Sequence, residues 1–427
     1  MKKVIASVGL VAMGAAALQA ADSMTSVTAP EATKPYTLGM VGRGFFDDNI
    51  ATRSSDQRKS SYGFEVSPSA ALRLNSEVTQ LRAEYIYSMR YFFDRSPHRA
   101  DHMHQLDASL HHAFSERCRV KLEDSFAIAQ EPTILGGGVF VNAPIRANGN
   151  NMRNVLNANV DGDLTEKIGL GLGYQNTWYD YQNHGQDSSY SALLDRFEHL
   201  FSVNLKYKVA EPTIALVGYQ FGAVHYTAKD RLQSLPVVIM PNARDNYSHY
   251  YFLGVDHQFN PQLMGSARAG AQTIDYHKLA GSKLRTSPYF DVALTYKYME
   301  GCAAQLGYKY SRMQTDVYTY TAGGNFPYTL DAQSSALYGS VEHSFIPEKF
   351  IGKLTGTYQN SNMRGGPADG KKEDFVVLGA DLTYNFTKFL AGQAGYNLDL
   401  LKSDLDMVTG YRSYHRNRVY LGVKATF

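Results

Sequence analysis

The segment VVLGADLTYNF, residues 376–386, places apolar or aromatic side chains at every even position. Gly, Asp, Thr and Asn occupy most of the odd positions. Successive side chains of a β-strand point to opposite faces, so this alternation predicts a strand with one apolar and one polar face. The segment has the length of about 9–11 residues that a tilted strand needs to cross a bilayer.

The same alternation continues from Tyr36 to Phe427, and segments 168–175, 251–259 and 419–427 show it most clearly. Short turns are expected at 75–77, 115–117, 165–167, 210–212, 260–262, 299–301, 346–349 and 387–389. Longer polar loops are expected at 48–59, 95–100, 131–150, 182–190, 228–245, 277–286, 315–333, 362–372 and 402–410. The pattern predicts an all-β fold, a closed antiparallel transmembrane β-barrel of about 18 strands, with 16 as the alternative count. An even strand number puts both termini on the periplasmic side, as in single-chain bacterial barrels.

The N-terminus has a different composition from the rest of the chain. Residues 1–21 combine Lys2 and Lys3 with an Ala-rich apolar run and small residues before Asp22, which is typical of a signal peptide. Residues 22–35 are small, polar and Pro-containing, and predict a flexible periplasmic lead-in. Residues 36–427 then form a single barrel domain, since no later apolar run is long enough for a spanning helix.

Composition excludes other classes. The 427 residues include 52 Tyr and Phe (31 plus 21), too many for a disordered chain, and only two Cys, too few for a disulfide scaffold. The net charge of +2 equals the charge of the two Lys in the signal peptide, so the mature chain has no general electrostatic reason to bind nucleic acid. The Tyr excess fits aromatic girdles at the membrane interfaces.

The polar strand faces carry charges of both signs, which must line a wet or internally paired lumen. Either cross-strand ion pairs make the wall rigid, or the charges line a weakly selective pore. Candidate pore-lining residues from this face are Arg82, Glu84, Arg90, Asp256, Arg268, Lys309 and Asp381.

One basic column departs from this mixture. The last strand places four cations on its inward face, and the first strand, which closes the barrel beside it, adds a fifth. They are Arg412, Arg416, Arg418 and Lys424, with Arg43. Such a track could attract anions or sugar acids, as rings of Arg and Lys do in anion pores. The alternative is pairing with acidic residues such as Asp47, Asp48 and Asp406.

Two of the long loops contain apolar residues, which predicts where these loops pack. Loop 131–150 either folds into the lumen as a constriction or stays on the surface, and apolar residues 237–240 of loop 228–245 are expected to pack inward.

His102 and His104 would share a strand face, but no metal motif accompanies them, so no metal site is expected. Cys118 and Cys302 fall on the fifth and thirteenth strands, nearly opposite each other, which predicts two free thiols.

The chain resembles the type 2 family of β-barrel porins. The resemblance runs from Phe45 to Phe427 and is clearest in segments 101–132 and 248–276. It implies an outer-membrane channel and supplies no catalytic residues. The terminal Phe427, preceded by apolar residues at every second position, also resembles the signal for the barrel insertion machinery.

The sequence therefore predicts a passive outer-membrane channel for small hydrophilic solutes, without cofactor or metal. A barrel associated with exopolysaccharide export is the first alternative, and an outer-membrane enzyme is the second. No G-x-S-x-G elbow, P-loop or H-E-x-x-H motif is present. Expected partners are outer-membrane lipid and lipopolysaccharide, the insertion machinery and the solutes, and a homo-oligomer is possible.

Overall fold

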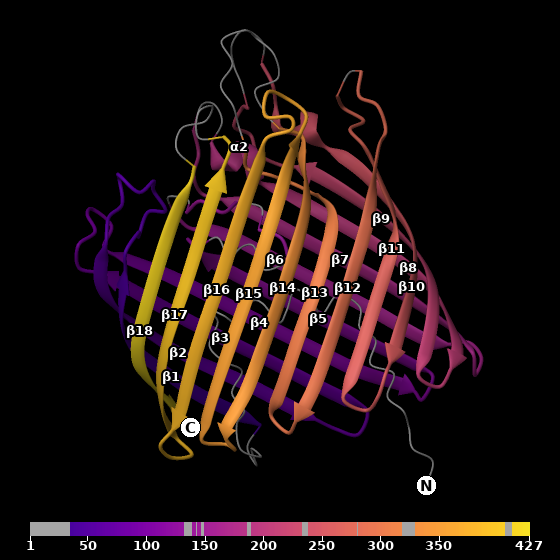
Figure 1. Ribbon diagram of the computed structural model, residues 1–427, viewed down its shortest axis with the longest axis horizontal. Helices are drawn as coiled ribbons and strands as arrows, with labels where there is room; N and C mark the ends of the chain where they lie inside the picture. Colours follow the sequence, from indigo (N-terminus) through magenta and orange to yellow (C-terminus); the bar gives the residue numbers. More distant parts are fainter. Residues whose placement is uncertain are drawn as a thin grey trace.

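The chain folds into one closed barrel of 18 antiparallel strands (Figure 1). The computed structural model describes residues 35–131, 139–141, 143–146, 149–185, 189–232, 238–279, 281–317, 329–405 and 412–427. The expected signal peptide and almost all of the lead-in lie outside this range. The strands are β1 (Tyr36–Asp47), β2 (Ser61–Asn75), β3 (Thr79–Phe92), β4 (Ala100–Ser115), β5 (Cys118–Ala129), β6 (Asn151–Asp163), β7 (Ile168–Tyr181), β8 (Arg196–Ala210), β9 (Thr213–Tyr226), β10 (Asn246–Gln258), β11 (Leu263–Asp275), β12 (Arg285–Met299), β13 (Cys302–Met313), β14 (Asp331–Ile346), β15 (Phe350–Arg364), β16 (Lys372–Asn385), β17 (Leu390–Ser403) and β18 (Tyr414–Thr426). The predicted count of 18 is confirmed.

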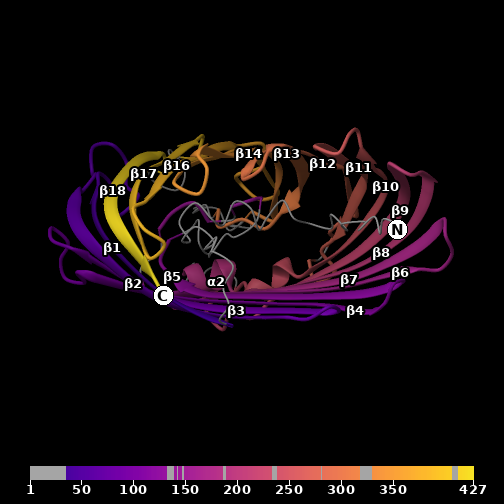
Figure 2. The same ribbon diagram turned by 90° about the horizontal axis from the view of Figure 1, so that it is seen from below.

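Each strand pairs with its neighbours in sequence, and β1 pairs with β18 to close the sheet. This seam runs in register from Gly39 opposite Thr426 to Asp47 opposite Arg418. Viewed along its axis, the barrel has a flattened outline, and chain segments lie inside it (Figure 2). Because β1 begins where β18 ends, both ends of the barrel domain lie at the same rim.

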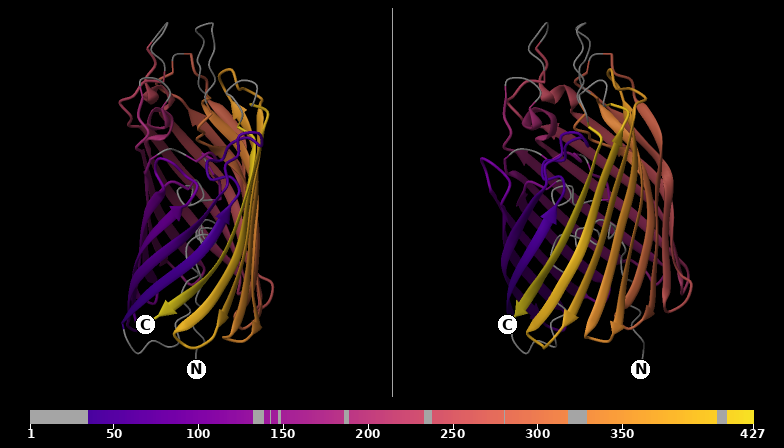
Figure 3. Two further views of the ribbon diagram at one scale, coloured as in Figure 1. Left: turned by 90° about the vertical axis from the view of Figure 1, so that its left-hand side faces the viewer. Right: turned by 60° about the vertical axis from the view of Figure 1, so that its left-hand side comes forward.

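The two rims differ in their connections (Figure 3). All eight predicted short turns occur where expected, at the rim that holds the ends of the domain, and the long loops are at the other rim. Two short helical turns, α2 (Tyr190–Leu194) and η2 (Pro241–Arg244), belong to the long loops. Among the described residues, no helix has the length and apolar character to cross a bilayer.

Side-chain exposure follows the predicted alternation. Outward residues such as Leu421 and Leu253 are 71% and 65% exposed, whereas inward residues beside them, such as Phe252, are buried. A band of exposed Leu, Val, Phe and Tyr around a closed sheet is the surface of a membrane-spanning barrel, and the fold is that of bacterial outer-membrane proteins.

Several inward rings lie flat against the wall over glycine. Phe252 lies beside Gly218, Tyr338 beside Gly307, and a Cβ at either glycine would collide with the ring. Gly395 and Tyr420 make the same arrangement. Gly is therefore required on these inward faces because only a residue without a side chain lets the ring approach the neighbouring strand. The Tyr excess is thus divided between the girdles and the inner wall.

The two cysteines lie on β5 and β13, as predicted, and both thiols are free. The expectation for residues 237–240 needs correction. Ile239 packs against a buried cluster, but Val238 is 53% exposed and Met240 is 37% exposed. Residue 237 lies outside the described residues. The inward packing is therefore limited to one side chain, since successive residues of an extended segment point in opposite directions.

A charge on the outer face should cost far more than the same charge on the inner face. Leu337 points outward near the middle of β14, and Ser340 points inward on the same strand. We expect Leu337→Arg to lower the free energy of unfolding by ~2–4 kcal/mol. The measurement is reversible unfolding in lipid vesicles, with Ser340→Arg as the control. Equal losses in the two variants would contradict the assigned faces.

Candidate functional site

The described part of loop 131–150 lies inside the barrel and contacts the wall opposite its own ends. The loop leaves β5 and returns at β6, yet Val139 packs against Ala336 and Tyr338 of β14. Val141 and Ile145 pack against a cluster on the last three strands, formed by Phe375, Leu401 and Tyr414. The described part of the loop therefore lies in the lumen and not on the surface. We call residues 139–146, apart from residue 142, the lumen loop.

Hydrogen bonds reinforce these apolar contacts. The backbone N–H of Val141 donates to Oε1 of Gln359 at 2.7 Å, and Nε2 of Gln359 donates to the Val141 carbonyl at 3.1 Å. The Tyr414 hydroxyl donates to the Pro144 carbonyl at 2.6 Å. Satisfied backbone groups allow an irregular segment to remain buried, because an unpaired buried polar group is costly.

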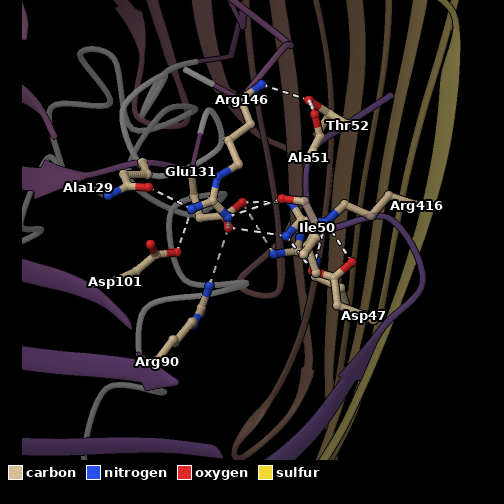
Figure 4. Close-up of polar contacts among 12 residues, drawn as sticks. Asp47, Ile50, Ala51, Thr52, Arg90, Asp101, Ala129, Glu131, Arg146 and Arg416 are labelled. Carbon is tan, nitrogen blue, oxygen red and sulfur yellow. Dashed lines mark hydrogen bonds and ion pairs between the residues drawn. The ribbon is translucent and has the colours of Figure 1, made fainter. Parts of the chain in front are cut away.

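A buried charge cluster holds the base of the loop (Figure 4). Nη1 of Arg416 lies 2.8 Å from Oε2 of Glu131, and Nε of Arg416 lies 3.0 Å from Oδ2 of Asp47. Arg146 donates to Oδ2 of Asp101 at 2.6 Å. We call Asp47, Asp101, Glu131, Arg146 and Arg416 the anchor cluster.

Arg146 also connects the lumen loop to the long loop after β1. Its backbone N–H donates to Oγ1 of Thr52 at 2.9 Å, and its Nη1 donates to the carbonyl of Ile50 at 3.2 Å. Its Nη2 donates to Gln130 at 2.6 Å, beside Glu131. One arginine thus holds the end of β5, the start of β4 and the first long loop in a fixed arrangement.

Glu131 stays ionised although it is buried, because nearby arginines lower its pKa. Burial alone would raise the pKa of this carboxyl, but Arg416, Arg418 and Arg146 together outweigh burial and hold the pKa well below its ordinary value. The ionised form therefore stabilises the folded loop at every pH above the ordinary carboxyl pKa. This stabilisation is lost only as pH falls through the lowered value.

The structure places the five residues of the predicted basic track in two groups. The three arginines nearer the long-loop rim, Arg412, Arg416 and Arg418, are called the upper arginines. They are paired with carboxylates and do not form a column of free cations. Arg412 lies 2.6 Å from Glu373 and 2.8 Å from Asp316, and Arg418 lies 3.1 Å from Asp399. Arg416 is paired with Asp47 and Glu131 as above. Of the partners considered from the sequence, Asp47 is used and Asp406 lies outside the described residues.

The other two cations of the track lie nearer the short-turn rim. Arg43 faces Gly422 across the seam, and its guanidinium lies over the Tyr420 ring at 4.5 Å. Lys424 lies two residues further along β18 on the same face. Within the described residues, Arg43 forms no ion pair with a carboxylate, whereas all three upper arginines do.

The remaining candidate pore-lining residues all face inward, and most form ion pairs. Their pairs include Arg82 with Glu84, Arg90 with Glu65 at 2.7 Å, Arg268 with Asp256 at 2.7 Å, and Lys309 with Asp291 at 3.6 Å. Asp381 accepts a hydrogen bond from the Tyr420 hydroxyl. Arg82 and Glu84 lie on one strand, whereas the other three pairs join neighbouring strands, as expected for the cross-strand ion pairs of the sequence analysis.

Sequence reasoning missed most of the acidic partners. Glu373 and Asp399 have the inward parity of their strands, so alternation could have identified them. Glu131 and Arg146 lie in a loop without periodicity, and no sequence signal assigns them a position.

The histidines considered as metal ligands have other partners. The Tyr87 hydroxyl lies 2.7 Å from Nδ1 of His102, and the Tyr85 hydroxyl lies 2.8 Å from Nδ1 of His104. In the part of the chain that the structure describes, no three His, Cys, Asp or Glu side chains form a group that could hold a metal ion.

One Ser, His and Asp group lies among the long loops. Oγ of Ser189 donates to Oδ2 of Asp230 at 2.8 Å, and Nδ1 of His184 lies 3.2 Å from the same oxygen. In a hydrolase triad, His lies between Ser and the acid, whereas here Asp lies between the other two. Ser189 also caps α2 by accepting from the backbone N–H of Ala192. These contacts hold the loop and cap helix α2. Among the described residues, no histidine is in position to act as a base toward the Ser189 hydroxyl.

No protein-family model matches the sequence, and no curated protein matches it. Among solved structures, OccAB4 of Acinetobacter baumannii has 11% identity and a TM-score of 0.43, with 92% of this chain and 99% of that chain covered. The outer membrane protein OpdK of Pseudomonas aeruginosa has 12% identity and a TM-score of 0.41, with 92% and 99% covered. The FrpB iron transporter of Neisseria meningitidis has 10% identity and a TM-score of 0.42, with 93% and 83% covered. Likenesses this distant carry no argument about the function of this chain.

Removing one carboxylate should loosen the lumen loop. Glu131→Gln leaves buried arginines without their shared partner, which weakens the anchor by about 3–5 kcal/mol. We expect larger fluctuations of the open-channel current in planar bilayers. Glu123→Gln, on the strand that leads into the loop and in a partly exposed pair with Lys121, is the control and should leave the current steady. Identical current noise in both variants would exclude an anchoring role for Glu131.

Proposed function

We propose that this protein is an outer-membrane porin through which small hydrophilic solutes diffuse passively. The observation that carries the proposal is the combination of a closed 18-strand barrel with a lumen face of charged and polar side chains and a loop anchored across it. A lumen lined by ion pairs is compatible with water, and an anchored loop narrows it to a defined size. We further propose that the long loops face outside and the short turns face the periplasm.

The geometry favours this function over the two alternatives. The lumen loop lies across the path that an exported polysaccharide would follow, and both its apolar contacts and the anchor cluster hold it there. The Ser189 group has no histidine on the serine, so it supports no hydrolase.

The expected partners belong to the same proposal. The barrel would lie in outer-membrane lipid, with lipopolysaccharide around the long-loop rim. Phe427 pairs through its backbone with Leu38 and exposes its side chain at the closing seam, which suits recognition by the insertion machinery. The resemblance to type 2 porins supports a channel.

A conductance measurement tests the channel. Refolded protein in planar bilayers should give stepwise, ohmic currents, and added neutral sugars of increasing size should reduce the current until one size is excluded. The same preparation checked for folding by heat-modifiable gel migration serves as the control. A folded barrel that conducts no ions would refute the proposal.

We also propose that any anion preference arises from Arg43 and not from Arg412, Arg416 and Arg418, whose charges are offset by carboxylates. Arg43→Gln should move the reversal potential in a salt gradient toward cation selectivity. Lys309→Gln combined with Asp291→Asn removes an ion pair without changing the net charge, and should cause no shift. A shift only in this second variant would contradict the assignment.

A further inference from the structure

The outer wall carries the same tyrosine–histidine pair four times on the side of the long loops, and a fifth pair, Tyr298–His343, lies at the short-turn rim. In each of the four, the Tyr lies on a strand that runs toward a long loop, and the His lies on the strand that returns from it. The four pairs are Tyr85–His104, Tyr87–His102, Tyr174–His199 and Tyr219–His249, with the hydroxyl 2.8, 2.7, 2.9 and 2.8 Å from Nδ1. We call them the Tyr–His pairs.

Their geometry is uniform. The ring centroids are 6.2, 6.1, 6.1 and 6.1 Å apart. Every pair is diagonal: the residue opposite Tyr219 is Tyr251, and His249 lies two positions nearer the long loop. The same offset holds on the β3–β4 and β7–β8 hairpins. Repetition on three separate hairpins indicates a feature of the wall and not a single local contact.

Three of the pairs lie at one height on the lipid-facing side, and Tyr87–His102 lies two residues nearer the long loop than Tyr85–His104. His104, His199 and His249 share the outward parity of exposed Leu106, Phe201 and Leu253. Each is eight residues along its strand from an aromatic residue at the short-turn rim, namely His112, Tyr207 and His257. Eight residues are about 26 Å of strand. A strand tilt of about 40° turns this into about 20 Å along the barrel axis, against an apolar band of about 25 Å in outer-membrane barrels. The pairs therefore lie near the edge of the apolar band on the long-loop side.

Each pair leaves one ring nitrogen for an outside partner. The tyrosine hydroxyl uses Nδ1, and within the described residues no hydrogen bond reaches Nε2 of these four rings. For His199, the amide nitrogen of Asn176 also lies 3.1 Å from Nδ1. An amide N–H can only donate, so Nδ1 accepts, and Nε2 carries the hydrogen of the neutral ring. The His199 ring thus presents an N–H donor to the outside, and the other three rings present the same nitrogen when their Tyr hydroxyl donates to Nδ1.

The β3–β4 hairpin adds a full positive charge above its two pairs. Nη1 of Arg99 lies 3.4 Å from the Tyr91 hydroxyl, on an exposed part of the same hairpin. Imidazole N–H groups with a guanidinium above them suit phosphate oxygens, which accept several hydrogen bonds at once.

We propose that the Tyr–His pairs bind the phosphorylated headgroup of lipopolysaccharide and so fix the height of the barrel in the outer leaflet. This rests on the proposed outer-membrane location and orientation. The tyrosine positions the imidazole, and the imidazole Nε2–H donates to the phosphate.

The test is native mass spectrometry of the full chain in detergent micelles titrated with lipid A, with EDTA present to remove bridging cations. A variant with His102, His104, His199 and His249 all replaced by Phe should bind about tenfold more weakly or worse, since each site loses a hydrogen bond. The matched control replaces His112, His257 and His343 with Phe at the short-turn rim, and should bind like the wild type. Heat-modifiable gel migration verifies that both variants are folded.

Further arms separate the sources of binding. Dephosphorylated lipid A should bind weakly, and inorganic phosphate alone should not displace lipid A at millimolar concentration. Unchanged binding by the fourfold variant, or equal binding of dephosphorylated lipid A, would overturn the proposal. Full displacement by inorganic phosphate would also overturn it, because the site would then bind a free anion. The binding assay needs no current, so a folded barrel that binds lipid A without conducting would refute only the channel.

Discussion

Closure of the sheet by β1 and β18 is the constraint on which the rest of the structure depends. In hydrocarbon, every backbone N–H and C=O must find a partner within the chain, and a sheet does this only if it has no open edge. The nine register pairs from Gly39–Thr426 to Asp47–Arg418 provide that closure. With every edge paired, a strand side chain has only two environments, lipid outside and lumen inside. The alternation of the sequence follows directly from this.

The lumen side then has to accommodate its charges and its loop together. Five arginines and five carboxylates meet where β1 and β18 approach the lumen loop: Arg90, Arg95, Arg146, Arg416 and Arg418 with Asp47, Glu65, Asp101, Glu131 and Asp399. Burying ions costs several kcal/mol each, so such a cluster is a weak source of stability. Its value lies in geometry, because planar guanidinium groups accept few arrangements of carboxylates. The anchor cluster thus specifies the position of the loop, while its charges nearly cancel.

The sequence predicts the positions of residues on strands, where polar and apolar side chains alternate, but not of residues in loops, where they do not. All eight short turns and the positions of Cys118 and Cys302 followed from the two-residue period, because a barrel strand repeats one rule. Arg43, Arg416, Arg418 and Lys424 have the predicted inward parity, but Arg412 precedes β18, which begins at Tyr414. The electrostatic role of the arginines depended on Glu373 and Asp399, which lie on other strands. Glu131 and Arg146 belong to an irregular segment whose position is set by contacts with β14 to β18. No local pattern encodes such contacts.

The tyrosines show how one residue type serves both environments of a closed sheet. On the outer face, the ring lies at the edge of the lipid and its hydroxyl holds an imidazole toward the headgroups, as in Tyr219 with His249. On the inner face, Tyr420 lies flat over Gly395 and its hydroxyl bonds to Asp381, so the ring covers backbone and leaves space in the lumen. The amino-acid composition counts outward and inward tyrosines together, whereas their odd or even position along a strand tells them apart. The excess of Tyr therefore has two causes. Outward Tyr side chains lie at the membrane interfaces, and inward Tyr rings cover the backbone of the barrel wall.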